Sequence, residues 1–269
     1  MDTVTAGSGQ VTVQAGGAVL AFGSTGQMVF VNGAGASTVA GGAGDMTVYG
    51  GTGHVSVYGL GGGGAFYGGT AGGNLLYTGA QATTLAGGGS GDTLIATGSA
   101  NHLLLAGVGN QTLSGAGASG NSAYFGNSGN VLIAAGSGQD TVVAGSGAQA
   151  IYAGARGNTA VFAGSGQDTV TLGSGADFVL GGQGSASVFG GSGVDLYGFL
   201  NGAGGREVIT GFKVGTDHLQ LIGFAGGSAA AAVAGAAVSG GATTLTLSDN
   251  TRVTLLGVTG VTGASLLGG

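Results

Sequence analysis

The sequence predicts an all-β fold: a parallel β-roll, or β-solenoid, of nonapeptide half-coils with a small C-terminal cap that contains a β-hairpin. Glycine supplies 69 of the 269 residues, and proline and cysteine are both absent. Much of this glycine recurs at steps of nine residues, and 43% of the chain is apolar. Glycine without a period would indicate disorder, so the period and the apolar content together predict a repetitive fold with a buried core.

The period is clearest in the second half of the chain. The second glycine of each repeat is Gly136, Gly145, Gly154, Gly164, Gly173, Gly182 and Gly191, at steps of nine with a single step of ten. Each unit joins a G-x-G turn, where glycine permits close backbone approach, to a short strand whose side chains alternate between two faces. Two units form one coil, so one rank should stack inward, each side chain contributing about 1.5 to 3 kcal/mol: Val142, Ile151, Val170, Val179 and Val188.

The same rhythm, with looser turns, reaches back to the start of the chain. We therefore predict a solenoid over residues 1–198, most regular and calcium-binding over 136–198, with roughly ten or eleven coils and a length on the order of 50 Å. The period stops after Gly198. Residues 199–269 form the predicted cap, with a hairpin of Thr243–Leu247 and Arg252–Leu256 around the turn at 248–250.

Units such as A-G-S-G-Q-D-T-V-V and G-G-S-G-V-D-L-Y-G resemble the nonapeptide repeats of repeats-in-toxin (RTX) proteins, the hemolysin-type calcium-binding family of type I secreted bacterial proteins. The segment G-F-K-V-G-T-D-H-L-Q-L is similar to the one that follows the repeats in that family. The resemblance covers residues 136–269 well and the first 135 by spacing alone. It implies a secreted protein, extracellular or at the cell surface, with its type I secretion signal within residues 199–269.

In the family, Ca2+ lies between adjacent coils and is held by glycine carbonyls and the repeat aspartate, oxygen ligands that suit this cation. Carried over to this chain, the resemblance implies these metal ligands: Asp140, Asn158, Asp168, Asp177, Asp195, Gly136, Gly138, Gly173, Gly175, Gly191 and Gly193. Alternate units share an edge, so one edge should carry Asp140, Asn158, Asp177 and Asp195, and the other Gln149, Asp168 and Ala186. Stacked carboxylates repel one another without a cation, so the first edge is the better calcium candidate.

A second interpretation of the aspartates needs no metal. Their carboxylates can accept hydrogen bonds from turn N–H groups, as Asx turns do, and we prefer this for Asp45 and Asp92. The turns of the first half mostly carry neutral residues in place of aspartate: His54, Asn101, Asn110, Asn121 and Asn130. This half is therefore expected to fold with little or no calcium.

The residue after each inward position should face outward, yet it is repeatedly large and apolar. These residues are Tyr49, Tyr58, Tyr67, Tyr77, Val143, Tyr152, Phe162, Leu180 and Phe189. Cross-strand stacking within one molecule explains them through β-propensity. An interaction surface is the alternative, because an exposed apolar stripe on a weakly charged rod favours association.

Composition excludes several functions. Only four residues are basic and the net charge is -6, which disfavours nucleic acid as a partner. No apolar run is long enough to predict a membrane span, and the first residues lack the charged and apolar regions of a cleavable signal peptide. The three histidines are dispersed, and neither a nucleophile elbow nor zinc spacing occurs, so we do not expect an enzyme.

The sequence thus predicts a secreted extracellular structural protein that folds with calcium and self-assembles into filaments, a surface layer or a matrix. The chain itself is the expected partner, by end-to-end growth somewhat more than by lateral packing, and a cell-surface or matrix polysaccharide is a further candidate. Two alternatives stay open: an adhesin or ice-binding module, although the outward residues are too mixed for ice, and an accessory calcium-binding module of a secreted enzyme.

Overall fold

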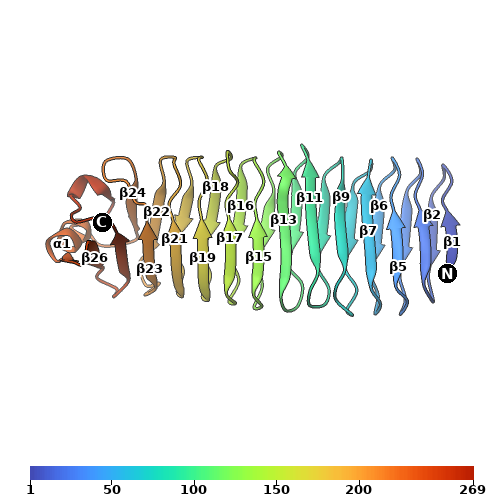
Figure 1. Cartoon of the computed structure of the whole chain (residues 1–269), viewed down its shortest axis with the longest axis horizontal. Coiled ribbons are helices and arrows are strands. Elements are labelled where there is room, and N and C mark those ends of the chain that lie inside the picture. The colour runs from blue at the N-terminus through green and yellow to red at the C-terminus, as the bar shows by residue number, and fades with distance from the viewer.

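The protein is a long rod in which short strands lie side by side along the main axis (Figure 1). The computed structural model describes all residues from 1 to 269. Up to residue 222, successive strands alternate between a 15-stranded sheet, which we name sheet A, and a 13-stranded sheet, which we name sheet B. The chain therefore completes one coil each time it passes through both sheets, and the solenoid has about 12 turns.

Sheet A contains, in spatial order, β1 (Asp2–Thr5), β3 (Val19–Phe22), β5 (Ser37–Ala40), β7 (Val55–Leu60), β9 (Leu75–Gly79), β11 (Thr93–Gly98), β13 (Gln111–Ala118), β15 (Val131–Ala134), β17 (Gln149–Tyr152), β19 (Gln167–Thr171), β21 (Ser185–Phe189), β23 (Arg206–Thr210), β27 (Arg252–Leu256), β26 (Ala242–Thr246) and β25 (Ala237–Ser239). Sheet B contains β2 (Val11–Gln14), β4 (Met28–Val31), β6 (Met46–Tyr49), β8 (Gly64–Tyr67), β10 (Thr83–Ala86), β12 (His102–Leu105), β14 (Ala123–Phe125), β16 (Asp140–Val143), β18 (Thr159–Phe162), β20 (Phe178–Leu180), β22 (Leu196–Leu200), β24 (His218–Ile222) and β28 (Leu266–Leu267).

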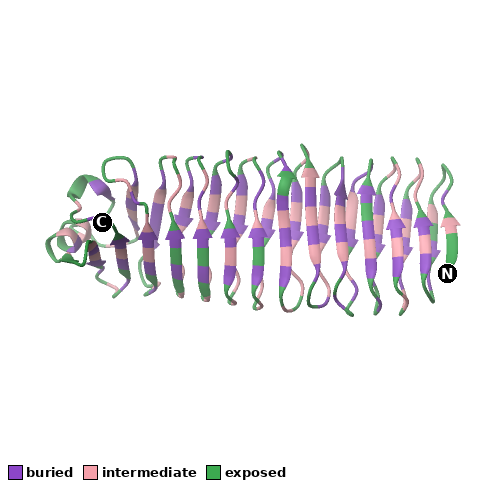
Figure 2. Cartoon of the chain, viewed as in Figure 1, coloured by how far each residue is buried: buried purple, intermediate pink, exposed green.

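The core is a single continuous cluster of 46 buried residues between the two sheets. Buried and more exposed positions alternate along most strands, as Figure 2 shows, because successive side chains of a strand point to opposite faces. The predicted inward rank is buried throughout: Val142, Ile151, Val170, Val179 and Val188. The predicted all-β, parallel solenoid is confirmed.

The parallel coils continue past residue 198, where the sequence period ends. β23 pairs with β21 and β24 pairs with β22, both in parallel. These coils take 21 residues, from Ala186 to Glu207, and 22 residues, from Leu196 to His218, but Ile209 and Leu219 still point into the core. Because inward side chains fix the register of a strand, coils persist after the turn spacing changes. The rod consequently has more turns than the ten or eleven expected for residues 1–198.

The C-terminal segment covers the last coil. β27 adds to β23 in parallel, and β26 and β25 follow in antiparallel order, which gives the predicted hairpin between β26 and β27. Asn250 has a φ of 69° in its turn, a conformation that asparagine tolerates better than most residues. The alanine-rich stretch forms a short helix, α1 (Ser228–Ala234), and a 3-10 turn, η1 (Gly263–Ser265), precedes β28. None of the helical segments has the length and apolar character needed to cross a membrane.

Candidate calcium-binding edges

The turns between the sheets stack along two edges of the rod. The first edge contains the turns from sheet A to sheet B, at residues 135–140, 153–159, 172–177, 190–195 and 211–217. The second edge contains the turns from sheet B to sheet A, including 87–92, 106–111, 126–131, 144–149, 163–168 and 181–186. Turns on one edge belong to successive coils, so oxygen atoms of neighbouring turns face each other along the rod axis.

Aspartates of the first edge bridge successive coils. Asp140 is buried, its Oδ1 accepts a hydrogen bond from the backbone N of Ser122 in the preceding coil at 2.7 Å, and its Oδ2 accepts one from Gly136 N at 2.7 Å. Asp177 accepts equivalent hydrogen bonds from Thr159 N and Gly173 N. Asp195 accepts them from Asp177 N and Gly191 N, and all four distances lie between 2.7 and 3.2 Å. The carboxylates thus make the Asx-type contacts and also line the gaps between turns.

Asp217 extends this ladder by one coil. Its Oδ1 accepts a hydrogen bond from Asp195 N at 3.0 Å, and its Oδ2 accepts one from Lys213 N at 2.8 Å. Sequence reasoning omitted Asp217 because it lies beyond the last nonapeptide. The signal that could have found it is the sequence G-T-D-H-L, in which an aspartate two residues after a glycine again precedes a strand.

The structure corrects the place of Asn158. Thr159, not Asn158, pairs with Asp140, and its buried hydroxyl has no hydrogen-bond partner. Asn158 is exposed, and its Oδ1 accepts a hydrogen bond from Ala176 N at 2.9 Å. The reason is the single ten-residue step of the repeat, which adds one residue to the turn at 153–159. The first edge therefore has a break in its carboxylate ladder at Thr159.

The second edge carries fewer repeat carboxylates. Asp168 is buried, and its oxygens accept hydrogen bonds from Gln149 N and Gly164 N, both at 3.0 Å. The next coil has Ala186, and the coil after it places Glu207 in register with Ala186. Glu207 is buried, and its Oε2 has no hydrogen-bond partner. Burial, reinforced by the charge of Asp168, raises the pKa of Glu207 to about 8. This carboxyl was not expected from the sequence because R-E-V-I-T does not follow the nonapeptide.

Burial also raises the pKa of the repeat aspartates Asp140, Asp168, Asp177 and Asp195, although backbone N–H groups partly offset the effect. The charges of the neighbouring carboxylates raise the pKa of Asp195 further. The ionised ladder is thus electrostatically costly, and a cation between the turns would lower this cost. Each ionised carboxylate can accept more than the two hydrogen bonds it receives, so free lone pairs remain for a metal.

Turn carbonyls supply the other oxygen ligands. A Cβ on Gly191 would lie 1.7 Å from Gly173 O, and a Cβ on Gly193 would lie 1.7 Å from Gly175 O. Gly154 has the same relation to Gly136 O, and Gly157 to Gly138 O. Turn carbonyls therefore point along the rod at the next turn, where only glycine fits. Carboxylate and carbonyl oxygens are the ligands that Ca2+ prefers, so the residues of these edges fit this ion.

A family model described as the RTX calcium-binding nonapeptide repeat matches the chain in four copies, over residues 33–57, 116–148, 154–188 and 162–197. The chain carries RTX repeats. RTX nonapeptide repeats bind Ca2+, and proteins with RTX repeats are generally secreted by type I systems. No curated protein matches this RTX chain.

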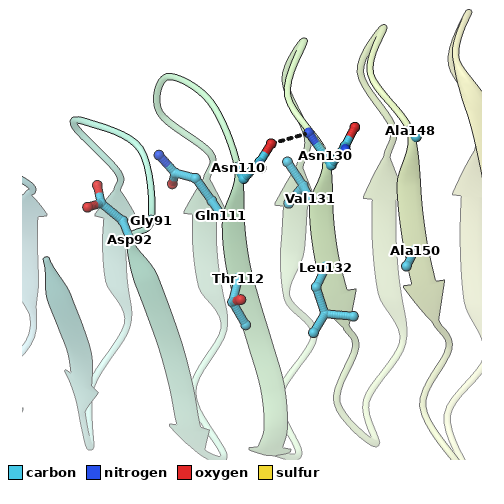
Figure 3. A pocket seen from close by; sticks show the side chains of 10 residues that line it. All are labelled: Gly91, Asp92, Asn110, Gln111, Thr112, Asn130, Val131, Leu132, Ala148 and Ala150. Carbon is cyan, nitrogen blue, oxygen red and sulfur yellow. Dashed lines mark hydrogen bonds between the residues drawn. The ribbon is translucent and has the colours of Figure 1, made fainter. Parts of the chain in front are cut away.

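Amide side chains bridge the coils in much of the first half of the RTX rod. Figure 3 shows a shallow depression on the second edge, where Asn110 Oδ1 accepts a hydrogen bond from Asn130 N at 2.9 Å. Gln111 lies beside it, and its Nε2 donates to Gly89 O at 2.8 Å. Asp92 is an exception, because it is buried and bonded to Asn74 and Gly88 in the same way as the later repeat aspartates. Neutral amides satisfy turn backbone groups without a metal.

Titratable residues do not converge elsewhere in the fold. His54 Nδ1 is bonded to Gly72 O, and His102 Nε2 is bonded to Thr97 O at 2.9 Å, so each ring contacts a backbone carbonyl. No group of three or more His, Cys, Asp or Glu residues is placed to hold a metal. The coil repeat separates successive aspartates, so a calcium ion in the edges draws on backbone carbonyls as well as carboxylates.

Proposed function

We propose that this RTX chain is an extracellular structural protein whose calcium-stabilised rods pack side by side into a filament, layer or matrix. The observation that carries the proposal is the rank of exposed aromatic side chains along the outer faces of both sheets. Exposed apolar groups gathered on one face are typical of surfaces that associate. Export by a type I system is part of the proposal, because proteins with RTX repeats are generally secreted by this route.

The aromatic ranks are regular. On sheet B, Tyr49 and Tyr67 are in register on adjacent strands, and their rings are stacked with centroids 5.3 Å apart and an interplanar angle of 4°. They are 47% and 39% exposed. On sheet A, Tyr152 and Phe189 are exposed on either side of Thr171. Rings already ordered by their neighbours lose little conformational freedom when a second molecule covers them, which favours packing.

The cap favours lateral packing over end-to-end growth. End-to-end growth would have to continue the parallel coils, but at the cap sheet A ends in β26 and β25, which pair in antiparallel order. The turn of the hairpin is also tied to the solenoid, because Asp249 Oδ2 accepts a hydrogen bond from Gly202 N at 2.8 Å. The side faces, with few charges to repel a second copy, are the larger remaining surface.

Sedimentation velocity over a wide concentration range, in about 5 to 10 mM calcium and in chelator, tests this function; these concentrations exceed the affinity range of extracellular calcium modules. We expect concentration-dependent assemblies in calcium, weakened by Tyr49→Ser with Tyr67→Ser. The matched control is Val108→Ser with Val194→Ser, which removes exposed apolar groups from the turns instead of the faces. A wild-type protein that stays monomeric would overturn the assembly proposal and favour a single rod acting as an adhesin.

A further inference from the structure

Lys213 stands at a turn position that the regular repeats give to glycine. In the turn at 190–195, Gly191 is four residues before Asp195, and its N–H donates to Asp195 Oδ2 at 3.1 Å. In the next turn of the first edge, Lys213 is four residues before Asp217, and its N–H donates to Asp217 Oδ2 at 2.8 Å. The contact between this N–H group and the aspartate is therefore the same in both turns, and Lys213 adds a side chain where the repeats have none.

The Lys213 side chain reaches back over the preceding turn. Its Nζ donates hydrogen bonds to Gly191 O at 2.6 Å and to Gly193 O at 3.2 Å. These oxygens belong to the residues four and two before the buried residue at the end of the turn, here Asp195, and we call such a pair the turn carbonyl pair. In the coil before, the same pair, Gly173 O and Gly175 O, is met by backbone alone: Gly173 O accepts a hydrogen bond from Ser192 N at 3.0 Å, and both oxygens lie against glycines of the next turn. Lys213 thus places a positive charge on a carbonyl pair that the regular turn before it meets with backbone alone.

Two side-chain amides on the second edge also donate hydrogen bonds to turn carbonyl pairs. Asn127 also stands four residues before the buried residue that follows its turn, Val131, and its Nδ2 donates to the turn carbonyl pair of the preceding coil, Gly107 O and Gly109 O. Gln149 Nε2 donates to the next pair, Asn127 O at 3.2 Å and Gly129 O at 2.9 Å. The turn carbonyl pair is therefore a recurrent acceptor site, which this chain satisfies in several coils with nitrogen donors of its own.

Charge makes Lys213 different from the amides. It lies beside the end of the carboxylate ladder, where burial and the charges of Asp217 and Asp177 raise the pKa of Asp195. An ammonium group offers three donors and a full positive charge, the feature that a calcium ion would bring to the same oxygens. It is one of only four basic residues in the chain.

We infer that the Lys213 ammonium is a built-in cation that fills the turn carbonyl pair of Gly191 and Gly193 in place of calcium, and so ends the calcium ladder of the first edge. The last repeat coil is then held to the cap without metal. This role concerns the calcium site of one rod and does not depend on assembly, so it is tested on protein dilute enough to be monomeric.

The test compares Lys213→Gly, which restores the residue of the regular repeats, with the wild-type protein by calcium titration calorimetry and thermal unfolding. We expect one additional calcium ion per chain in the variant. In chelator its Tm should fall by about 2–8 °C, as expected for a lost charge-assisted contact, and calcium should remove most of that loss. Lys213→Met, which keeps the stem and lacks both donor and positive charge, should lower Tm in chelator and in calcium alike.

The control for a general effect of removing a positive charge is Arg252→Gly, on β27 away from the turn carbonyl pairs; it should leave the calcium count unchanged. Equal calcium counts in Lys213→Gly and the wild type, or an equal Tm loss with and without calcium, would overturn the inference. If Lys213→Gly does not fold in chelator, the calcium count of the protein refolded in calcium decides the question.

Discussion

Glu207 gives the sharpest test of the electrostatics of the second edge. We consider Glu207→Gln, which replaces the buried carboxyl by a neutral group of nearly the same shape. The pKa of Glu207 is raised from 4.5 to about 8, first by burial and then by the charge of Asp168. The folded protein therefore binds this proton more tightly than the unfolded chain, and the free energy of unfolding should fall as the pH rises from about 4.5 to 8.

The magnitude follows from the two pKa values. One pKa unit corresponds to about 1.4 kcal/mol, so ionising Glu207 in the folded protein costs roughly 3 to 5 kcal/mol at pH 9. Glutamine avoids this cost. Below pH 5 both side chains are neutral in the folded state, so the variant and the wild type should differ by about 1 kcal/mol or less, the worth of a buried hydrogen bond.

Urea unfolding in chelator between pH 5 and pH 9, followed by circular dichroism, measures the difference. The Glu207→Gln variant should become progressively more stable than the wild type above pH 7. Asp2→Asn, which likewise replaces a carboxyl by an amide but at an exposed position, is the matched control, and the stability gap should be much smaller there than at Glu207. A stability gap that does not grow between pH 6 and pH 9 would refute the assignment of Glu207 as a costly buried charge.

Three further predictions follow from the edges and the cap. Calcium, with weak sites of about 0.1 to 1 mM, should slow hydrogen exchange in residues 136–217 more than in 1–130; equal protection of both halves in chelator would contradict this. Deleting residues 199–269 should abolish secretion and leave an aggregating rod, because it exposes strand edges and core; a secreted, monodisperse truncation would count against it. Thr159→Asp should close the break in the first ladder, lowering Tm in chelator by about 2–4 °C and raising it in calcium; an unchanged calcium response would speak against a site at this coil.

Much of the fold could be predicted because the same nonapeptide pattern of turn and strand residues recurs many times along the chain. A nine-residue period with one inward valine or isoleucine per unit permits a single register, since slipping by one residue would turn the core rank to solvent. Asp140, Asp168, Asp177 and Asp195 were assigned to the edges in the same way. Asn158 was misplaced, because counting units does not show which residue of a ten-residue step is the added one.

The sequence by itself determined the solenoid, the face of each repeat residue and the hairpin of the cap, because these depend on local alternation and turn residues that recur along the chain. Only the tertiary structure decided that the coils continue to β24, that Glu207 and Asp217 join the two edges, and that the Lys213 ammonium occupies a carbonyl pair of the coil before it. Each of these depends on contacts between residues about 20 positions apart in the sequence, where a long side chain reaches across the spacing of one coil. Such contacts depend on how whole coils stack, and the nonapeptide pattern does not indicate them.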